Sequence, residues 1–254
     1  MRCRLLIDDA AGSGSWNMAV DETLLESARS GTEATLRWYR WHEATVSLGY
    51  FQKSRAHDRD RFGTLPLVRR LSGGGAILHH HELTYSCTIG PQHPLAEDPT
   101  QLYVQVHQAI ISVLSDFGVP AAMRGEKIDD VEHLFLCFGR GDPRDVVIDG
   151  HKILGSAQRR RRGAILQHGS LLLRQSEHAE EFPGICELSG IDVSEDELLA
   201  ALATRVSQAL AASVELGALT DRERQLAEKL EEQKYRLLDW SAPRPALAHD
   251  VATR

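Results

Sequence analysis

The chain has 254 residues, of which 42% are hydrophobic and 26% are charged, a composition that allows one substantial core and excludes a disordered chain. Its formal net charge of −7 excludes a general nucleic-acid binder, because such proteins need an excess of Lys and Arg facing phosphates. No stretch approaches the ~20 apolar residues of a membrane-spanning helix, so we expect no membrane contact.

The N-terminus and the cysteines indicate the cell compartment. Residues 1–9 lack the apolar core and cleavage site of a signal peptide. The cysteines are Cys3, Cys87, Cys137 and Cys186. Their scatter, without CxxC spacing, predicts neither a zinc site nor a disulfide scaffold. We therefore expect a cytoplasmic protein.

The first predicted elements are strands and one helix. Residues 3–7 have the composition of a strand, and 15–25 combine polar capping residues with apolar positions at helical spacing, which predicts an amphipathic helix. Residues 34–39 and 45–50 are rich in β-branched and aromatic side chains. Residues 40–43 separate the two segments, which predicts a hairpin or paired strands.

The middle of the chain predicts a long helix and two hairpins. Residues 99–117 have helical period and end at a glycine. Asp149-Gly150 readily forms a type I′ turn, which predicts a hairpin over 146–154. A second hairpin follows, with its turn at 159–163 and its outgoing strand at 164–173.

The sequence of the C-terminal part predicts helices. Residues 195–212 and 221–237 carry mixed charges and apolar residues, and 241–254 have no apolar period and predict a frayed tail. With no linker and no repeat, we expect one α+β catalytic domain over 1–190, on which a helical extension over 191–240 packs.

A glycine-rich segment between predicted strands at 65–68 and 83–89 is the strongest local signal. Gly73–Gly75 remove every side chain from a short stretch, so a ligand can lie against bare amide groups. Arg70 nearby can satisfy an anionic or carbonyl group of that ligand. A flexible loop or a bulge between strands is the alternative.

Four separated segments, in order, carry a resemblance to one family: NMAVDETLL, SLGYFQ, RRLSGGGAILHHHELTYS and DGHKILGSAQRRRRGAILQHGSLLL. Together they resemble the lipoate and octanoate protein ligase and transferase family. The resemblance implies a mixed, largely antiparallel sheet flanked by helices, related to the catalytic domain of biotin ligases. It also implies an acyl chain beside the glycine-rich loop, with Lys152 meeting the acyl carbonyl.

Cys137 separates the two reactions of that family. Its ligases make an acyl adenylate from ATP and need no cysteine, whereas its octanoyltransferases accept an acyl group from a carrier thioester onto a cysteine without a cofactor. In the cysteine-dependent relatives a Cys-Phe pair lies fifteen residues before the lysine, as Cys137-Phe138 does before Lys152. The resemblance therefore implies that Cys137 is the nucleophile. The alternative is a small buried hydrophobic residue.

The proposed chemistry needs a thiolate. A free thiol, with a pKa near ~8.5, is only a few per cent ionised at neutral pH. We expect the Lys152 ammonium to favour the Cys137 thiolate and to hydrogen-bond the carbonyl oxygen as charge develops on it. A solvated hairpin lysine is the alternative reading.

The resemblance implies further residues of the substrate site: Arg70, Ser72, Gly73, Gly74, Gly75, Ala76, His79, Gly155, Ser156, Ala157 and His168. For His168 a core histidine is an equal alternative. The run His79-His80-His81 invites a metal hypothesis, but three consecutive strand residues cannot all point to one side, so we expect no metal.

The cluster Arg159, Arg160, Arg161 and Arg162 has two readings. It is either a solvated turn or a docking patch for acyl carrier proteins and lipoyl domains, which are commonly acidic.

The leading functional prediction is an octanoyl-[acyl-carrier-protein]:protein N-octanoyltransferase. It would deliver octanoyl groups to lysines of lipoyl-domain proteins such as the glycine cleavage H protein and the E2 subunit of 2-oxoacid dehydrogenases. The alternatives are an ATP- and Mg-dependent lipoate-protein ligase, an octanoyl or lipoyl amidotransferase between carrier proteins, and an acyl-binding module without turnover.

Overall fold

The structure is a computed structural model and describes every residue except 32, 54–55, 126–134, 140 and 238–254. Its main strands are β1 (Arg2–Ile7), β2 (Ala34–Tyr39), β6 (Glu82–Ile89), β7 (Ala122–Met123), β8 (Val146–Ile148), β9 (His151–Arg161), β10 (Ala164–Leu172) and β11 (Ser213–Leu216). In the described residues these form an eight-stranded sheet in the order β11-β1-β2-β6-β10-β9-β8-β7. Within this sheet, β1 pairs in parallel with β11 and with β2, and the other described pairings are antiparallel. The predicted mixed, largely antiparallel α+β fold is confirmed.

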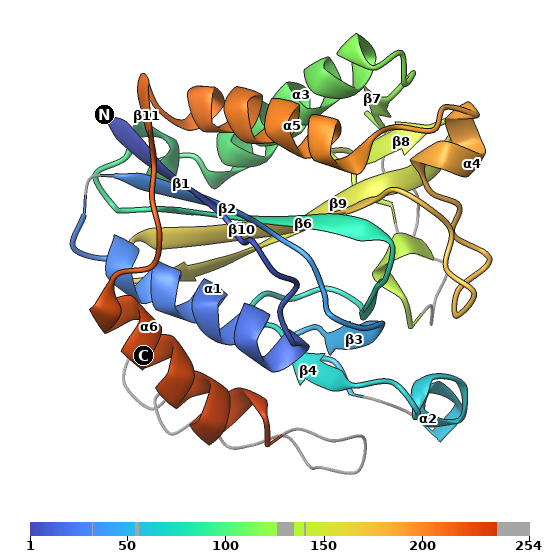
Figure 1. The fold of residues 1–254 in the computed structure, drawn as a ribbon, viewed down its shortest axis with the longest axis horizontal. Helices are drawn as coiled ribbons and strands as arrows, with labels where there is room; N and C mark the ends of the chain where they lie inside the picture. Colours follow the sequence, from blue (N-terminus) through green and yellow to red (C-terminus); the bar gives the residue numbers. More distant parts are fainter. Residues whose placement is uncertain (32, 54–55, 126–134, 140, 238–254) are drawn as a thin grey trace.

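Helices cover both faces of this sheet (Figure 1). They are α1 (Gly14–Ala28) and α6 (Asp221–Leu230) on one face, and α3 (Pro99–Asp116) and α5 (Glu195–Leu210) on the other. The predicted helices form because their ends are capped: Ser13 accepts a hydrogen bond from the Trp16 amide, and Asp98 caps the amide of Thr100. The largest hydrophobic cluster lies between the sheet and the pair α3 and α5.

A second, three-stranded sheet contains β4 (Leu67–Arg69), β3 (Thr45–Leu48) and β5 (Ile77–His79), in that order. The predicted hairpin between residues 34–39 and 45–50 is therefore wrong. β2 pairs with β1 and β6, whereas β3 pairs with β4 and β5. Both strands are buried along their whole length, so neither carries the alternating polar face that would have indicated its partner.

The two predicted hairpins form. Asp149 and Gly150 have φ of 47° and 80°, which places both turn residues in the left-handed region that a type I′ turn requires. The second turn is shorter than predicted, since it consists only of Arg162 and Gly163, with φ of 50° and 82°. The preceding arginines belong to β9 and not to the turn.

The C-terminal extension takes part in the sheet. Besides the predicted helices it contributes β11, which runs parallel to β1 at the sheet edge and was not predicted, because it is short and exposed. Helix α6 continues into a π-helical turn, Glu231–Tyr235. The predicted tail at 241–254 lies outside the described residues.

The remaining elements are short: α2 (Ala56–Phe62), α4 (Ile185–Ser189) and the 3-10 helices Pro94–Ala96 and Cys137–Gly139. No helix in the described part of the chain is long and apolar enough to cross a membrane.

Candidate active site

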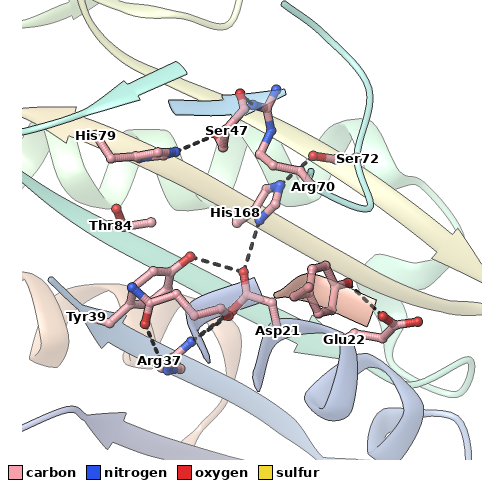
Figure 2. A network of polar contacts seen from close by, with 12 residues as sticks. Asp21, Glu22, Arg37, Tyr39, Ser47, Arg70, Ser72, His79, Thr84 and His168 are labelled. Atoms are coloured by element: carbon pink, nitrogen blue, oxygen red, sulfur yellow. Dashed lines mark hydrogen bonds and ion pairs between the residues drawn. The ribbon is translucent and has the colours of Figure 1, made fainter. Parts of the chain in front are cut away.

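The glycine-rich loop between β4 and β5 is held by a buried arginine. The guanidinium of Arg70 lies beside Ser47 (Figure 2) and donates to its carbonyl oxygen at 2.6 Å. It also donates to the carbonyl oxygen of Gly75 at 2.8 Å. Burial lowers the pKa of Arg70 to about 10. Gly74 has φ of 93°, a conformation that strains any other residue. Arg70 therefore stabilises the loop conformation, a structural role that the sequence analysis did not predict. Arg70 also lines the cavity described below.

Cys137 is tied directly to this loop. The Ala76 amide donates to the Phe135 carbonyl at 2.9 Å, and the Cys137 amide donates to the Ala76 carbonyl at 2.6 Å. A methyl group on Gly75 would lie 3.0 Å from the Phe135 oxygen, so a glycine is needed for this close approach. The loop and the cysteine segment, far apart in the sequence, thus form one surface.

A β-bulge turns Lys152 toward the same surface. Lys152 and Gly155 are three residues apart and would face opposite sides of a regular strand. The pairing register between β8 and β9 shifts at this point: Val147 pairs with Lys152, whereas Val146 pairs with Leu154. The extra residue in β9 brings the Lys152 side chain to the side on which Gly155 would carry a Cβ.

The Lys152 side chain is positioned by two neighbours. Its Nζ lies 2.9 Å from Oδ1 of Asp145, and both side chains are 5% exposed, so the carboxylate offsets the cost of burying the ammonium. Burial raises the pKa of Asp145, although the lysine opposes that effect. A Cβ on Gly155 would lie only 2.3 Å from Cε of Lys152, so the glycine provides the space that the lysine occupies.

These groups surround a cavity of about 290 Å³. It is lined by Arg70, Gly73, Gly74, Ile77, Tyr103, Cys137, Phe138, Lys152, Gly155, Ser156, Ala157 and Gln158. Lys152 Nζ also lies 5.6 Å from the centre of the Phe138 ring. The structure therefore brings both predicted catalytic residues and six of the predicted substrate-binding residues to one cavity.

Five other predicted substrate-binding residues do not line it: Ser72, Gly75, Ala76, His79 and His168. His79 is buried between Glu82, whose carboxylate is 2.7 Å from Nδ1, and Ser47, whose hydroxyl is 2.6 Å from Nε2. It also stacks on Trp41. Burial lowers the pKa of His79, so it is a neutral core residue that supports the loop from behind.

A buried Ser-His-Asp chain also lies behind the loop (Figure 2). His168 hydrogen-bonds Ser72 through Nε2 and Asp21 through Nδ1, the latter at 3.1 Å. Burial by itself would raise the pKa of Asp21, but the His168 hydrogen bond and the charge of Arg37 outweigh it and lower that pKa. Ser72 is 0% exposed, so this chain anchors the loop and offers no accessible nucleophile.

Three residues that the sequence analysis missed complete the site: Asp145, Tyr103 and His107. His107 Nε2 lies 2.7 Å from the Ser156 hydroxyl, and burial lowers the pKa of His107 to about 4. Burial raises the pKa of Tyr103 to about 12. Of these three residues, only Asp145 could have been found from the sequence, because it directly precedes the predicted hairpin over 146–154 and therefore lies across that hairpin from Lys152. The two aromatic residues lie on α3, where nothing marked them out from core residues.

The four arginines of the cluster at residues 159–162 have different environments. Arg159 packs over the Tyr50 ring at 4.7 Å, and Arg161 pairs with Glu22 at 3.2 Å and with Glu26 at 2.5 Å. Arg160 and Arg162 are exposed. A docking surface on this hairpin therefore has two exposed arginines and not four.

Known proteins resemble this chain over most of its length. Residues 13–206 match the family model described as the lipoyl protein ligase A/B catalytic domain. Octanoyltransferase LipM of Symbiobacterium thermophilum is 33% identical over 266 aligned residues, which cover 93% of this chain and 97% of that protein. LipM of Kyrpidia tusciae is 33% identical over 269, with the same two coverages.

Solved structures resemble the whole described fold. Lipoate-protein ligase A bound with ATP superposes with a TM-score of 0.75 at 26% identity, covering 94% of this chain and 98% of that one. A bipartite lipoate protein ligase from Thermoplasma acidophilum gives 0.73 at 26%, covering 94% and 96%. The LipM relatives indicate an acyltransferase. The expected family is thus confirmed: this protein belongs to the lipoyl protein ligase A/B catalytic domain family.

Proposed function

We propose that this protein is an octanoyl-[acyl-carrier-protein]:protein N-octanoyltransferase that holds the acyl group on Cys137. The observation that carries the proposal is that Cys137 and Lys152 line one cavity beside the glycine-rich loop. An adenylate-forming ligase has no use for a cysteine there. The names of the LipM relatives support the same reaction.

The first step is thioester exchange. The Cys137 thiolate attacks the carbonyl carbon of the carrier thioester, the new C–S bond forms, and the carrier thiol leaves with its electron pair and takes up a proton. Lys152 donates a hydrogen bond to the oxyanion of the tetrahedral intermediate. Asp145 neutralises much of the Lys152 charge, and Arg70 is a second buried cation that lines the same cavity.

The second step forms an amide. The neutral amine of an acceptor lysine attacks the Cys137 thioester, the C–N bond forms, the C–S bond breaks, and the thiolate is restored as the amine loses a proton. An amide is more stable than a thioester, so the reaction needs no ATP. The proposed acceptors are lipoyl-domain proteins, the H protein and E2, and the T. acidophilum ligase was solved in a study of its own E2 lipoyl domain.

One alternative has an observation in its favour. The structural similarity to an ATP-bound lipoate-protein ligase supports ATP-dependent ligation in the same cavity. An amidotransferase that takes octanoyl or lipoyl from another lipoyl-domain protein would use the same cysteine and lysine.

Intact-mass spectrometry after mixing the protein with octanoyl carrier protein, without ATP, distinguishes these reactions. The transferase acquires one octanoyl mass, which hydroxylamine removes and which Cys137→Ala does not acquire. Octanoyl H protein replaces the carrier in a parallel arm, and stronger loading there favours the amidotransferase. Product that forms only with ATP and free acid contradicts the transferase.

A further inference from the structure

Two turns place three potential metal ligands together, none of which lines the cavity described above. His80 and His81 lie in the turn between β5 and β6. Glu177 lies in a second turn, which is closed by a bridge between Ser176 and Ala179. The ligand atoms of the three side chains all lie within 4.8 Å of one another.

The distances are close to those of an occupied site. His80 Nδ1 is 3.5 Å from a carboxylate oxygen of Glu177, and His81 Nε2 is 3.9 Å from the same oxygen. A zinc ion 2.0–2.2 Å from its ligands in tetrahedral geometry holds the ligand atoms about 3.3–3.6 Å apart. The rings of His80 and His81 now lie with their centroids 3.6 Å apart, so these side chains, which are partly or fully exposed, would also rotate to point both nitrogens at one ion.

The backbone supports this arrangement. His81 has φ of 52°, in the left-handed region, so its side chain does not follow the alternating directions of the side chains in β5. Its carbonyl accepts hydrogen bonds from the amides of Leu173 at 3.0 Å and Arg174 at 3.2 Å. These bonds hold the two turns together without an ion, so binding would order few additional backbone residues.

The geometry differs from the sequence expectation for a clear reason. Three consecutive histidines cannot share one side of a strand, but only His79 belongs to β5, and its side chain is buried elsewhere. His80 and His81 lie in the turn, and the third ligand comes from a segment almost one hundred residues away in the sequence. No spacing rule for metal motifs covers this combination.

We propose that His80, His81 and Glu177 form a binding site for one divalent transition-metal ion, best suited to Zn²⁺. Two imidazoles and one carboxylate are a ligand set that zinc uses when its fourth position holds water. The ion replaces the Ser176 hydroxyl as the partner of His80 Nδ1, which that hydroxyl now contacts at 2.9 Å. His178 Nε2 lies 3.8 Å from the other oxygen of Glu177.

The ion would link the turn at residues 80–81 to the turn at residues 176–179. It binds the folded chain, where the three ligands meet, far better than the unfolded one. A saturating ion therefore raises the melting temperature, by on the order of 5 °C at one hundred times the dissociation constant.

The test is a Co²⁺ titration of the full-length, tag-free protein followed by absorption spectroscopy. We expect one equivalent of Co²⁺ to give visible ligand-field bands that Zn²⁺ abolishes, without the near-ultraviolet band of cobalt bound to sulfur. Cys137→Ser should titrate as the wild type does, which separates this site from the catalytic cysteine.

Matched variants decide whether these three residues are the ligands. Glu177→Gln and His81→Asn should each weaken binding at least about 10-fold, since even the loss of a supporting group costs that much. Asn suits the positive φ at position 81, so the fold is preserved. Exposed Glu180→Gln and His151→Gln serve as controls and should bind normally. Wild-type affinity in Glu177→Gln, a sulfur band, or no saturable binding would each overturn the proposal.

Discussion

Replacing Gly155 by alanine tests how Lys152 is positioned. The added Cβ would lie 2.3 Å from Cε and 2.7 Å from Nζ of Lys152, whereas non-bonded carbons rest about 3.5–4.0 Å apart. The end of the lysine must therefore move by more than about 1 Å. That movement breaks its 2.9 Å contact with Asp145 and displaces the ammonium within the cavity that Cys137 also lines.

Both activity and stability are expected to fall. A misplacement of about 1 Å at a catalytic group costs about 100-fold in rate, which corresponds to about 2.7 kcal/mol. The atoms that clash belong to the free end of a flexible side chain and not to the backbone, so Gly155→Ala should fold. Because the variant separates a buried ion pair, we expect its free energy of unfolding to fall by up to about 3 kcal/mol.

The assay is the rate of octanoyl-enzyme formation by rapid-quench mass spectrometry, with urea unfolding as the stability measurement. Gly31→Ala is the matched control, because a Cβ there meets only one atom, at 3.9 Å. A wild-type acylation rate in a folded Gly155→Ala protein would refute the assigned position of Lys152. So would an equal loss in Gly31→Ala.

Three further results are expected. Burial lowers the pKa of His107 to about 4 from an unfolded value of about 6.5, so the unfolded state takes up the proton first and stability is lost as the pH falls from about 6.5 to about 4. His107→Gln should remove up to about 3 kcal/mol of that loss, and identical urea midpoints against pH in both proteins would contradict it. Ser72→Ala leaves a buried His168 nitrogen unpaired and should cost about 1–3 kcal/mol of stability while acylation at 25 °C stays within a few-fold; complete inactivity of a folded variant would mean that Ser72 reacts. The double change Arg160→Ser and Arg162→Ser should raise KM for the carrier and weaken its salt dependence, and an unchanged salt response would rule out docking at this turn.

The sequence predicted those parts of the fold that local chemistry determines. The Asp149-Gly150 turn and the capped helix at 99–116 follow from residues next to each other. The partner of β3 does not, because a fully buried strand has no polar face to set its register. β11 was missed for the opposite reason, since its exposed residues carry no core pattern.

The candidate site likewise has parts that the sequence predicted and parts that it did not. Family motifs led to Cys137, Lys152 and the glycine loop, and the structure brings them together. The Asp145 contact depends on a bulge that shifts the register by one residue, which no propensity predicts. Pairing of Arg161 with Glu22 depends on where α1 crosses the sheet, so four similar arginines could not be separated in advance.

The central claim is that the acyl group passes through Cys137, and a single-turnover chase tests it most directly. Octanoyl-enzyme is made from carrier thioester, freed of carrier and of any nucleotide, and mixed with a lipoyl domain. The octanoyl mass should move to one acceptor lysine while the enzyme returns to its unmodified mass. An octanoyl-enzyme that stays loaded while amide forms only with ATP and free acid would contradict the claim.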